Sequence, residues 1–83
     1  IMTEITLDDI IQIAKNAKLD SEVDFDKFDP DKKILEQGID SLDFTKLLFE
    51  VEDTFQITIP DEDFDEKKWD TLNKIVEKVN LLR

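Results

Sequence analysis

Apolar residues recur at helical spacing in three stretches of the chain. In the first, after Thr6, they fall at intervals that place them on a single helix face: Leu7, Ile10, Ile11, Ala14 and Ala17. This pattern predicts a helix that begins after Thr6 and fades near Leu19–Asp20. Thr6 and Asp9 have the spacing of a capping box, in which each side chain pairs with the backbone of the other residue.

The second stretch predicts a helix over residues 41–55. Asp40 is a good N-cap, and Asp43 lies in the first turn, where the helix dipole favours a negative charge. One face of this helix is apolar and is expected in the core: Phe44, Leu47, Leu48, Val51 and Phe55. Leu42 and Phe49 lie two turns apart on the opposite face, where Thr45, Lys46 and Asp53 accompany them.

The third stretch predicts a C-terminal helix that follows Asp70 or Thr71 as its cap. Its apolar stripe contains five positions: Leu72, Ile75, Val76, Val79 and either Leu82 or Leu81. Lys74, Lys78 and Arg83 suit its C-terminal half, where the helix dipole favours positive charge.

The connections between these helices differ in length. Residues 21–39 contain Pro30 and the only glycine, Gly38, and predict a long ordered loop whose apolar side chains reach the core. Residues 57–60 predict an extended connection rather than a strand, because no partner strand is evident. Asp61, Glu62 and Asp63 then suit the first turn of a short helix, with Phe64 packed beneath it. The expected fold is all-α: a four-helix bundle of three main helices and one short helix, with a long first loop, in one domain over residues 1–83.

Composition narrows the possible functions. The 83 residues carry 22 acids against 11 bases, a net charge of −11, with no His and no Cys. This charge makes nucleic acid an improbable partner and favours proteins with basic surfaces. The charge is uneven: residues 1–40, 41–66 and 67–83 carry −6, −8 and +3. No run of about 18 apolar residues predicts a membrane span, and no signal peptide is evident, so we expect a cytoplasmic protein. We also expect a monomer.

Ser41 opens the second helix between two aspartates, in the stretch GIDSLDF of residues 38–44. A Ser-His-Asp triad is excluded because the chain has no histidine. A pair of Ser41 with Lys46 is disfavoured, since carboxylates around the lysine would keep it protonated. The acidic segments do not match a calcium-binding EF-hand loop, so we expect no specific metal site, and weak, nonspecific binding of divalent ions by the acidic middle of the chain stays open. A phosphodiester on the Ser41 hydroxyl, in contrast, would suit the start of a helix. The serine is therefore predicted to be a passive acceptor modified by a separate enzyme.

The same residues resemble the attachment motif of the acyl carrier protein family. Gly38-Ile39-Asp40-Ser41-Leu42-Asp43 is similar to the family's phosphopantetheine site, and Ile59-Pro60-Asp61-Glu62-Asp63 is similar to its Ile-Pro-Asp-Glu-Glu stretch. The resemblance covers nearly the whole chain. It implies that the protein is not an enzyme but a carrier, with 4′-phosphopantetheine on Ser41 and with Asp40 and Leu42 beside it.

The resemblance also implies partners. A phosphopantetheinyl transferase would modify Ser41, and acyl-transferring and synthase enzymes with basic patches would dock on the second helix. The expected docking residues combine apolar contacts with acids: Leu42, Asp43, Phe49, Glu50 and Asp53.

Several residues depart from the common pattern of the family, among them Gln37, Phe44, Lys46 and Phe49. These departures favour a specialised carrier over the housekeeping fatty-acid carrier. The acidic second helix favours fatty acyl or polyketide cargo. Two alternatives remain open: an aminoacyl, peptidyl or D-alanyl carrier, and an acidic helical adaptor that is phosphorylated at Ser41 and has no prosthetic group.

Overall fold

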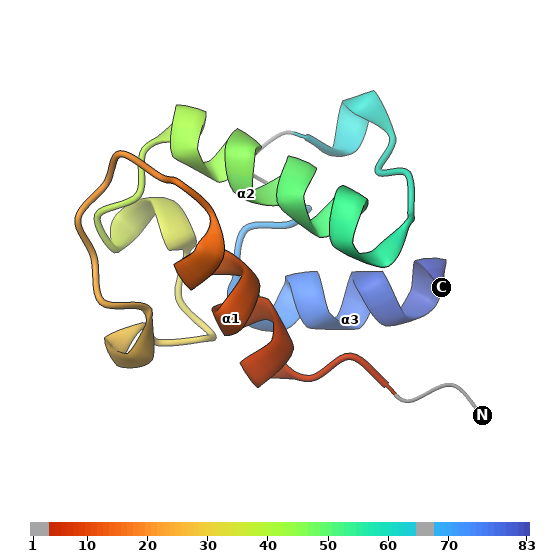
Figure 1. The fold of residues 1–83 in the computed structure, drawn as a ribbon, viewed down its shortest axis with the longest axis horizontal. Coiled ribbons are helices and arrows are strands. Elements are labelled where there is room, and N and C mark those ends of the chain that lie inside the picture. Colours follow the sequence, from red (N-terminus) through yellow and green to blue (C-terminus); the bar gives the residue numbers. More distant parts are fainter. Residues whose placement is uncertain (1–3, 65–67) are drawn as a thin grey trace.

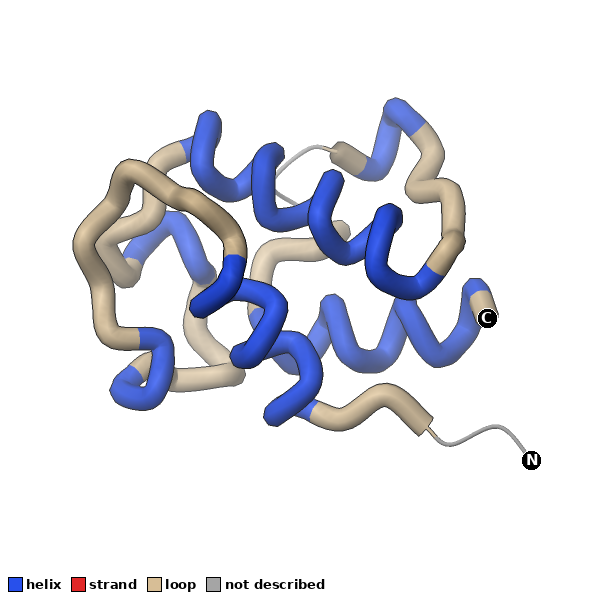
Figure 2. Tube along the Cα trace, in the orientation of Figure 1, coloured by secondary structure: helices blue, strands red, loops and turns tan. Residues whose placement is uncertain are grey.

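A computed structural model of the chain describes residues 4–64 and 68–83 (Figure 1). It contains three α-helices: α1 (Leu7–Asn16), α2 (Ser41–Phe55) and α3 (Leu72–Leu82). Three single turns of 3₁₀-helix lie in the connections: η1 (Phe25–Lys27), η2 (Ile34–Glu36) and η3 (Asp61–Asp63). Figure 2 shows helices and loops and no strand over the described ranges. The all-helical prediction is confirmed, and none of these helices is long and apolar enough to span a membrane.

The count of four helices is not confirmed. The short helix expected after Pro60 is, over the described residues, only the 3₁₀ turn of Asp61–Asp63, and residues 65–67 lie outside the description. The preceding segment 57–60 forms neither helix nor strand, in line with the predicted connection. It follows Gln56, which ends α2 in the left-handed conformation with φ 55°. Glu52 holds the segment in place, because its Oε2 accepts the backbone N–H of Ile59 at 2.6 Å.

The first and last helices are capped as expected. Thr6 and Asp9 form both hydrogen bonds of the capping box at the start of α1. This helix ends at Asn16 rather than near Leu19–Asp20, since Ala17 already has an extended backbone. Thr71 caps α3, with its hydroxyl oxygen accepting the N–H of Lys74 at 3.0 Å.

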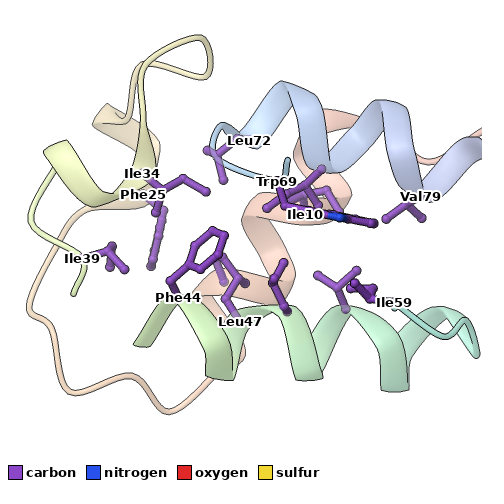
Figure 3. Close-up of a cluster of buried hydrophobic side chains, with 14 of the residues drawn as sticks. Ile10, Phe25, Ile34, Ile39, Phe44, Leu47, Ile59, Trp69, Leu72 and Val79 are labelled. Atoms are coloured by element: carbon purple, nitrogen blue, oxygen red, sulfur yellow. The ribbon is translucent and has the colours of Figure 1, made fainter. Parts of the chain in front are cut away.

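The apolar faces of the three helices meet in one core (Figure 3). Phe44 and Leu47 of α2 point toward α3 and α1, where Leu72 and Ile10 face them. The buried apolar residues come from every helix and from the connections: Ile5, Ile10, Ala14, Phe25, Ile34, Ile39, Phe44, Leu47, Leu48, Val51, Ile59, Trp69, Leu72, Ile75 and Val79. The core face predicted for α2 is confirmed except at Phe55, which is only partly buried.

The end of α3 departs from the prediction. Leu81 and Leu82 are 76% and 46% exposed, so neither continues the buried stripe of Leu72, Ile75 and Val79. Leu81 is two residues after Val79, about 200° around the helix, so it lies on the side opposite the buried stripe. Asn80, directly before Leu81, does contact another segment: its side-chain amide accepts the backbone N–H of Ile5 at 2.8 Å and donates to the Ile5 carbonyl at 3.0 Å.

The long loop of residues 21–39 is ordered by three buried side chains, Phe25, Ile34 and Ile39. Its backbone is tied to the start of α3, since the N–H of Ile34 donates to the carbonyl of Asp70 at 2.8 Å. The side chain of Gln37 accepts the N–H of Asp29 at 2.8 Å and donates to its carbonyl at 2.9 Å, which closes the loop on itself. The loop is thus a fixed support that leads directly into Ser41.

Candidate functional site

Ser41 is the first residue of α2 and is exposed. The helix starts here because Asp40 has an extended backbone and its Oδ1 accepts the N–H of Asp43 at 2.8 Å. The carbonyl of Asp40 accepts the N–H of Phe44 at 2.9 Å, which forms the first helical turn. As at every helix start, the first backbone N–H groups have no partner within the helix, so this end of α2 favours an anion on Ser41.

Two residues before the cap fix the direction from which the chain enters the helix. Gly38 has φ +95°, a conformation that side-chain-bearing residues rarely adopt. A Cβ at this position would lie 3.0 Å from Cγ1 of Val23 on the opposite side of the loop. Ile39 follows and is buried, with 2% exposed. Ile39 holds the chain to the core and Gly38 allows the turn, so Asp40 and Ser41 emerge on the surface.

Asp43, predicted as a docking residue, is not part of the exposed surface, because its side chain is only 1% exposed. Its carboxylate accepts three hydrogen bonds from the loop that follows α1. The N–H of Asp20 donates to Oδ1 at 3.1 Å, the N–H of Ser21 donates to Oδ2 at 2.8 Å, and the Ser21 hydroxyl donates to the same oxygen. Asp43 therefore holds the loop against the first turn of α2 and offers no charge to a partner.

These contacts change how Asp43 titrates. The hydrogen bond from the Ser21 hydroxyl lowers the pKa of Asp43 below its ordinary value of 3.8, and burial opposes the shift without reversing it. The N–H groups of Asp20 and Ser21 and the positive charge of Lys46 lower the pKa further. Asp43 is therefore ionised in the folded protein at neutral pH.

The exposed face of α2 contains the other predicted docking residues. Leu42 and Phe49 are 62% and 56% exposed, although both are large and apolar. Glu50 and Asp53 are also exposed and surround Phe49 on the helix. The prediction that this face lies away from the core is confirmed, and the face combines two apolar side chains with two exposed acids.

Two features of the site had little signal in the sequence. Phe64 was expected beneath a short helix, but its ring packs against Phe49 with the centroids 5.0 Å apart, so it widens the apolar surface. Ser21 gave no signal, since it lies far from Asp43 in the chain and in a segment without periodicity. The sequence signal for this contact is limited to the aromatic character of Phe49 and Phe64, since aromatic side chains tend to pair.

The residues around Ser41 fit a covalently attached phosphate group. The hydroxyl is on the surface, the helix start favours negative charge, and the nearest acid with a buried charge, Asp43, is already hydrogen-bonded to the loop. Within residues 4–64 and 68–83 there is no cluster of acids suited to holding a metal ion. The site thus presents a nucleophile that another protein can reach.

Comparisons with known proteins agree with this geometry. The family model described as "Phosphopantetheine attachment site" matches residues 9–79. The chain is similar to the D-alanyl carrier protein of Bacillus licheniformis, with 43% identity over 72% of this chain and 78% of the relative. The D-alanyl carrier protein of Bacillus velezensis is 41% identical over 69% of this chain and 74% of its own. That of Lactobacillus delbrueckii subsp. bulgaricus is 39% identical over 64% and 68%. No solved structure gave a significant match.

Proposed function

The chain belongs to the phosphopantetheine-attachment family of carrier proteins, and on that premise we propose that Ser41 is the residue that bears 4′-phosphopantetheine. Of the two serines in the described residues, Ser21 donates its hydroxyl hydrogen to the carboxylate of Asp43, whereas Ser41 is exposed at the start of a helix. This exposure is the observation that carries the proposal. Such carriers are not catalysts; enzymes act on them in trans. We assign residues 1–83 to one carrier domain, acting as a monomer in the cytoplasm.

Each residue around Ser41 has a separate part in this function. When attached, the phosphopantetheine arm supplies a terminal thiol on which an acyl group is carried as a thioester. Asp40 caps α2 and so fixes where the helix begins, with Ser41 as its first residue. Asp43 holds the loop that supports this end of the helix, and Leu42 remains exposed beside the serine for contact with an enzyme.

We further propose that the exposed face of α2 is where enzymes dock. Leu42 and Phe49 provide apolar contacts, and Phe64 extends the surface next to Phe49. Glu50 and Asp53 provide negative charge that attracts basic side chains of the partner. A phosphopantetheinyl transferase and the enzymes that load and unload the cargo would share this face, since all must reach Ser41.

For the cargo we propose D-alanine or a similarly small amino acid. The three relatives named above are D-alanyl carrier proteins, which favours the alternative of an aminoacyl carrier over fatty acyl or polyketide cargo. The acidic second helix, from which fatty acyl cargo was inferred, suits any enzyme with a basic docking patch. The hypothesis of an adaptor without a prosthetic group is at odds with the family match.

Mass spectrometry tests the attachment residue. The wild-type chain and Ser41→Ala would be incubated with coenzyme A and a promiscuous phosphopantetheinyl transferase, and intact masses measured. We expect the wild type to gain the mass of one phosphopantetheinyl group and Ser41→Ala to gain none. An adduct that persists in Ser41→Ala would refute the assignment. The Ser21→Ala variant is the matched control and should be modified like the wild type.

The cargo is tested separately. The holo protein would be offered D-alanine, other small amino acids and medium-chain fatty acids, each with ATP and an extract of the native host. The loaded mass identifies the cargo, because a thioester adds the mass of its acyl group and is removed by hydroxylamine. Loading with a fatty acid and not with D-alanine would overturn the cargo proposal and leave the carrier function intact.

A further inference from the structure

Lys46 is the only basic residue between positions 41 and 66, a stretch with nine acids. It lies four residues after Leu42 and three before Phe49, spacings that place all three side chains on one helix face. The proposed docking face therefore has a positive charge between its two apolar contacts. If the face served only to attract basic partners, a positive charge at Lys46 would weaken that attraction, so the charge needs a separate explanation.

The ammonium group of Lys46 is available to a partner. Its side chain is 40% exposed, and its Nζ lies 3.4 Å from Oδ2 of Asp20, whose side chain is 83% exposed. An ion pair this exposed contributes little and exchanges readily with other partners. The ammonium has three hydrogens to donate and uses one of them on Asp20.

Lys46 adds little to the support of the loop, because its one hydrogen bond there, to Asp20, is exposed to water. The buried carboxylate of Asp43 lies 3.9 Å from Nζ, beyond hydrogen-bond distance. It already accepts three hydrogen bonds from Asp20 and Ser21. The lysine therefore assists Asp43 by its charge only, and its position on the exposed face calls for another explanation.

We propose that Lys46 is a specificity-determining residue that selects enzymes presenting a carboxylate between their contacts to Leu42 and Phe49; this inference rests on the proposed function. An enzyme that contacts both Leu42 and Phe49 while it acts on Ser41 spans Lys46, which is five residues beyond the serine, about 7.5 Å of rise along the helix. A continuous basic patch would set a cation against the ammonium, and like charges at an interface are strongly disfavoured. A partner that combines bases facing Glu50 and Asp53 with one acid facing Lys46 is complementary.

The structure also indicates what the partner's carboxylate replaces. In the free protein Asp20 occupies the side of Lys46 nearest the loop. Docking exchanges this exposed pair for one that is shielded from water and hence stronger. Asp20 therefore competes with the partner, so its removal should favour docking. If the partner surface were uniformly basic, removing the same acid would weaken docking instead.

Kinetics of modification and loading test this proposal. The probes are the native host's phosphopantetheinyl transferase, acting on the apo protein, and an ATP-dependent enzyme that activates D-alanine, acting on the holo protein. For Lys46→Glu we expect KM to rise roughly tenfold with at least one enzyme while kcat is unchanged. For Asp20→Asn we expect KM to fall about twofold to threefold with the same enzyme.

Two matched variants control for net charge. Lys32→Glu makes the same charge change at an exposed lysine in the long loop, and Glu22→Gln removes an exposed acid two residues from Asp20. Neither should change KM by more than about twofold. A lower KM for Lys46→Glu, or a higher one for Asp20→Asn, would overturn the proposal in favour of a uniformly basic partner. An unchanged KM for Lys46→Glu with both enzymes would also overturn it.

The outcome is separable from that of the proposed function. If wild-type protein receives no phosphopantetheine, the proposed function fails and the Lys46 proposal fails with it. If it is modified but not loaded with D-alanine, only the cargo is wrong, and the transferase arm alone decides the role of Lys46. Thermal unfolding of Lys46→Glu is measured alongside, and Lys46→Gln, which removes the charge without reversing it, should raise KM by less.

Discussion

At the scale of single residues, Asp40 and Asp43 show how the same side chain takes opposite roles beside Ser41. Asp40 is exposed and caps the helix through one hydrogen bond, to the N–H of Asp43. Asp43 is buried, and its carboxylate accepts hydrogen bonds from two consecutive residues of a distant segment. The two carboxylates are three positions apart. Asp40 caps the helix, and Asp43 in its first turn holds the loop that follows α1.

Replacing Asp43 by Asn should destabilise the fold, because an amide cannot accept from the N–H groups of Asp20 and Ser21 with both of its polar atoms. The folded-state pKa of Asp43 lies below 3.8. The stabilisation by the ionised carboxylate is therefore complete above the ordinary, unfolded-state pKa of 3.8. It is lost as the pH falls through the lower folded-state pKa. Urea unfolding at neutral pH, near pH 4 and at about pH 2 would measure the gap in the free energy of unfolding between the wild type and Asp43→Asn.

We expect that gap to be largest at neutral pH and to shrink at the lowest pH. Asp40→Asn is the matched control, since asparagine caps helices as well as aspartate and the Asp40 side chain is exposed. It should change stability by less than about 0.5 kcal/mol at neutral pH. A gap for Asp43→Asn that stays constant over the pH range would show that the charge of the carboxylate is not what stabilises the loop.

At the scale of elements, α2 separates two functions on two faces. Phe44, Leu47, Leu48 and Val51 are buried in the core, while Leu42 and Phe49 are exposed. Because the helix is packed on one side, substitutions on the other side can alter docking without loss of the fold. The two faces can therefore be tested with one substitution each.

Phe49→Ala should reduce the rate at which enzymes act on Ser41 by roughly tenfold, while lowering the free energy of unfolding by about 1 kcal/mol at most, from the lost packing on Phe64. Val51→Ala should do the reverse, since it removes buried methyl groups at a cost of roughly 1–3 kcal/mol and leaves the docking face unchanged. Thermal melts and transfer kinetics on both variants check this. A large drop in melting temperature for Phe49→Ala would place its ring in the core.

What the sequence could predict follows from the range of the interactions. The bounds of α2, its cap and its two faces depend on residues within a few positions of one another, and these predictions are confirmed except at the partly buried Phe55. The burial of Asp43 depends on Ser21, 22 residues away, and the periodicity of α2 contains no trace of that loop. The exposure of Leu82 likewise depends on which side chains of other elements pack at the end of α3, which a helical stripe cannot show.

At the scale of the whole molecule, negative charge is concentrated in the segment that begins with α2 and continues past its end. Residues 41–66 carry −8 of the net −11, and residues 67–83 carry +3. Such asymmetry orients a basic partner during encounter, since the attraction acts over about a Debye length, roughly 10 Å at 0.1 M salt. The overall field would bring enzymes with basic surfaces to α2, and Lys46 would then distinguish among them at contact.

Local charge, rather than net charge, should govern the association rate. The double variant Glu50→Gln with Asp53→Asn removes two charges from the docking face, and Glu4→Gln with Glu77→Gln removes two from exposed positions on other elements. Both variants have the same net charge of −9, two fewer than the −11 of the wild type. Stopped-flow association with the phosphopantetheinyl transferase, repeated from about 20 to 300 mM salt, should show the first variant slowed roughly fivefold or more at low salt, with a flatter salt dependence. The second should remain within about twofold of the wild type. Equal slowing of both variants would mean that partners sense only the total charge, and the proposed docking face would lose its electrostatic support.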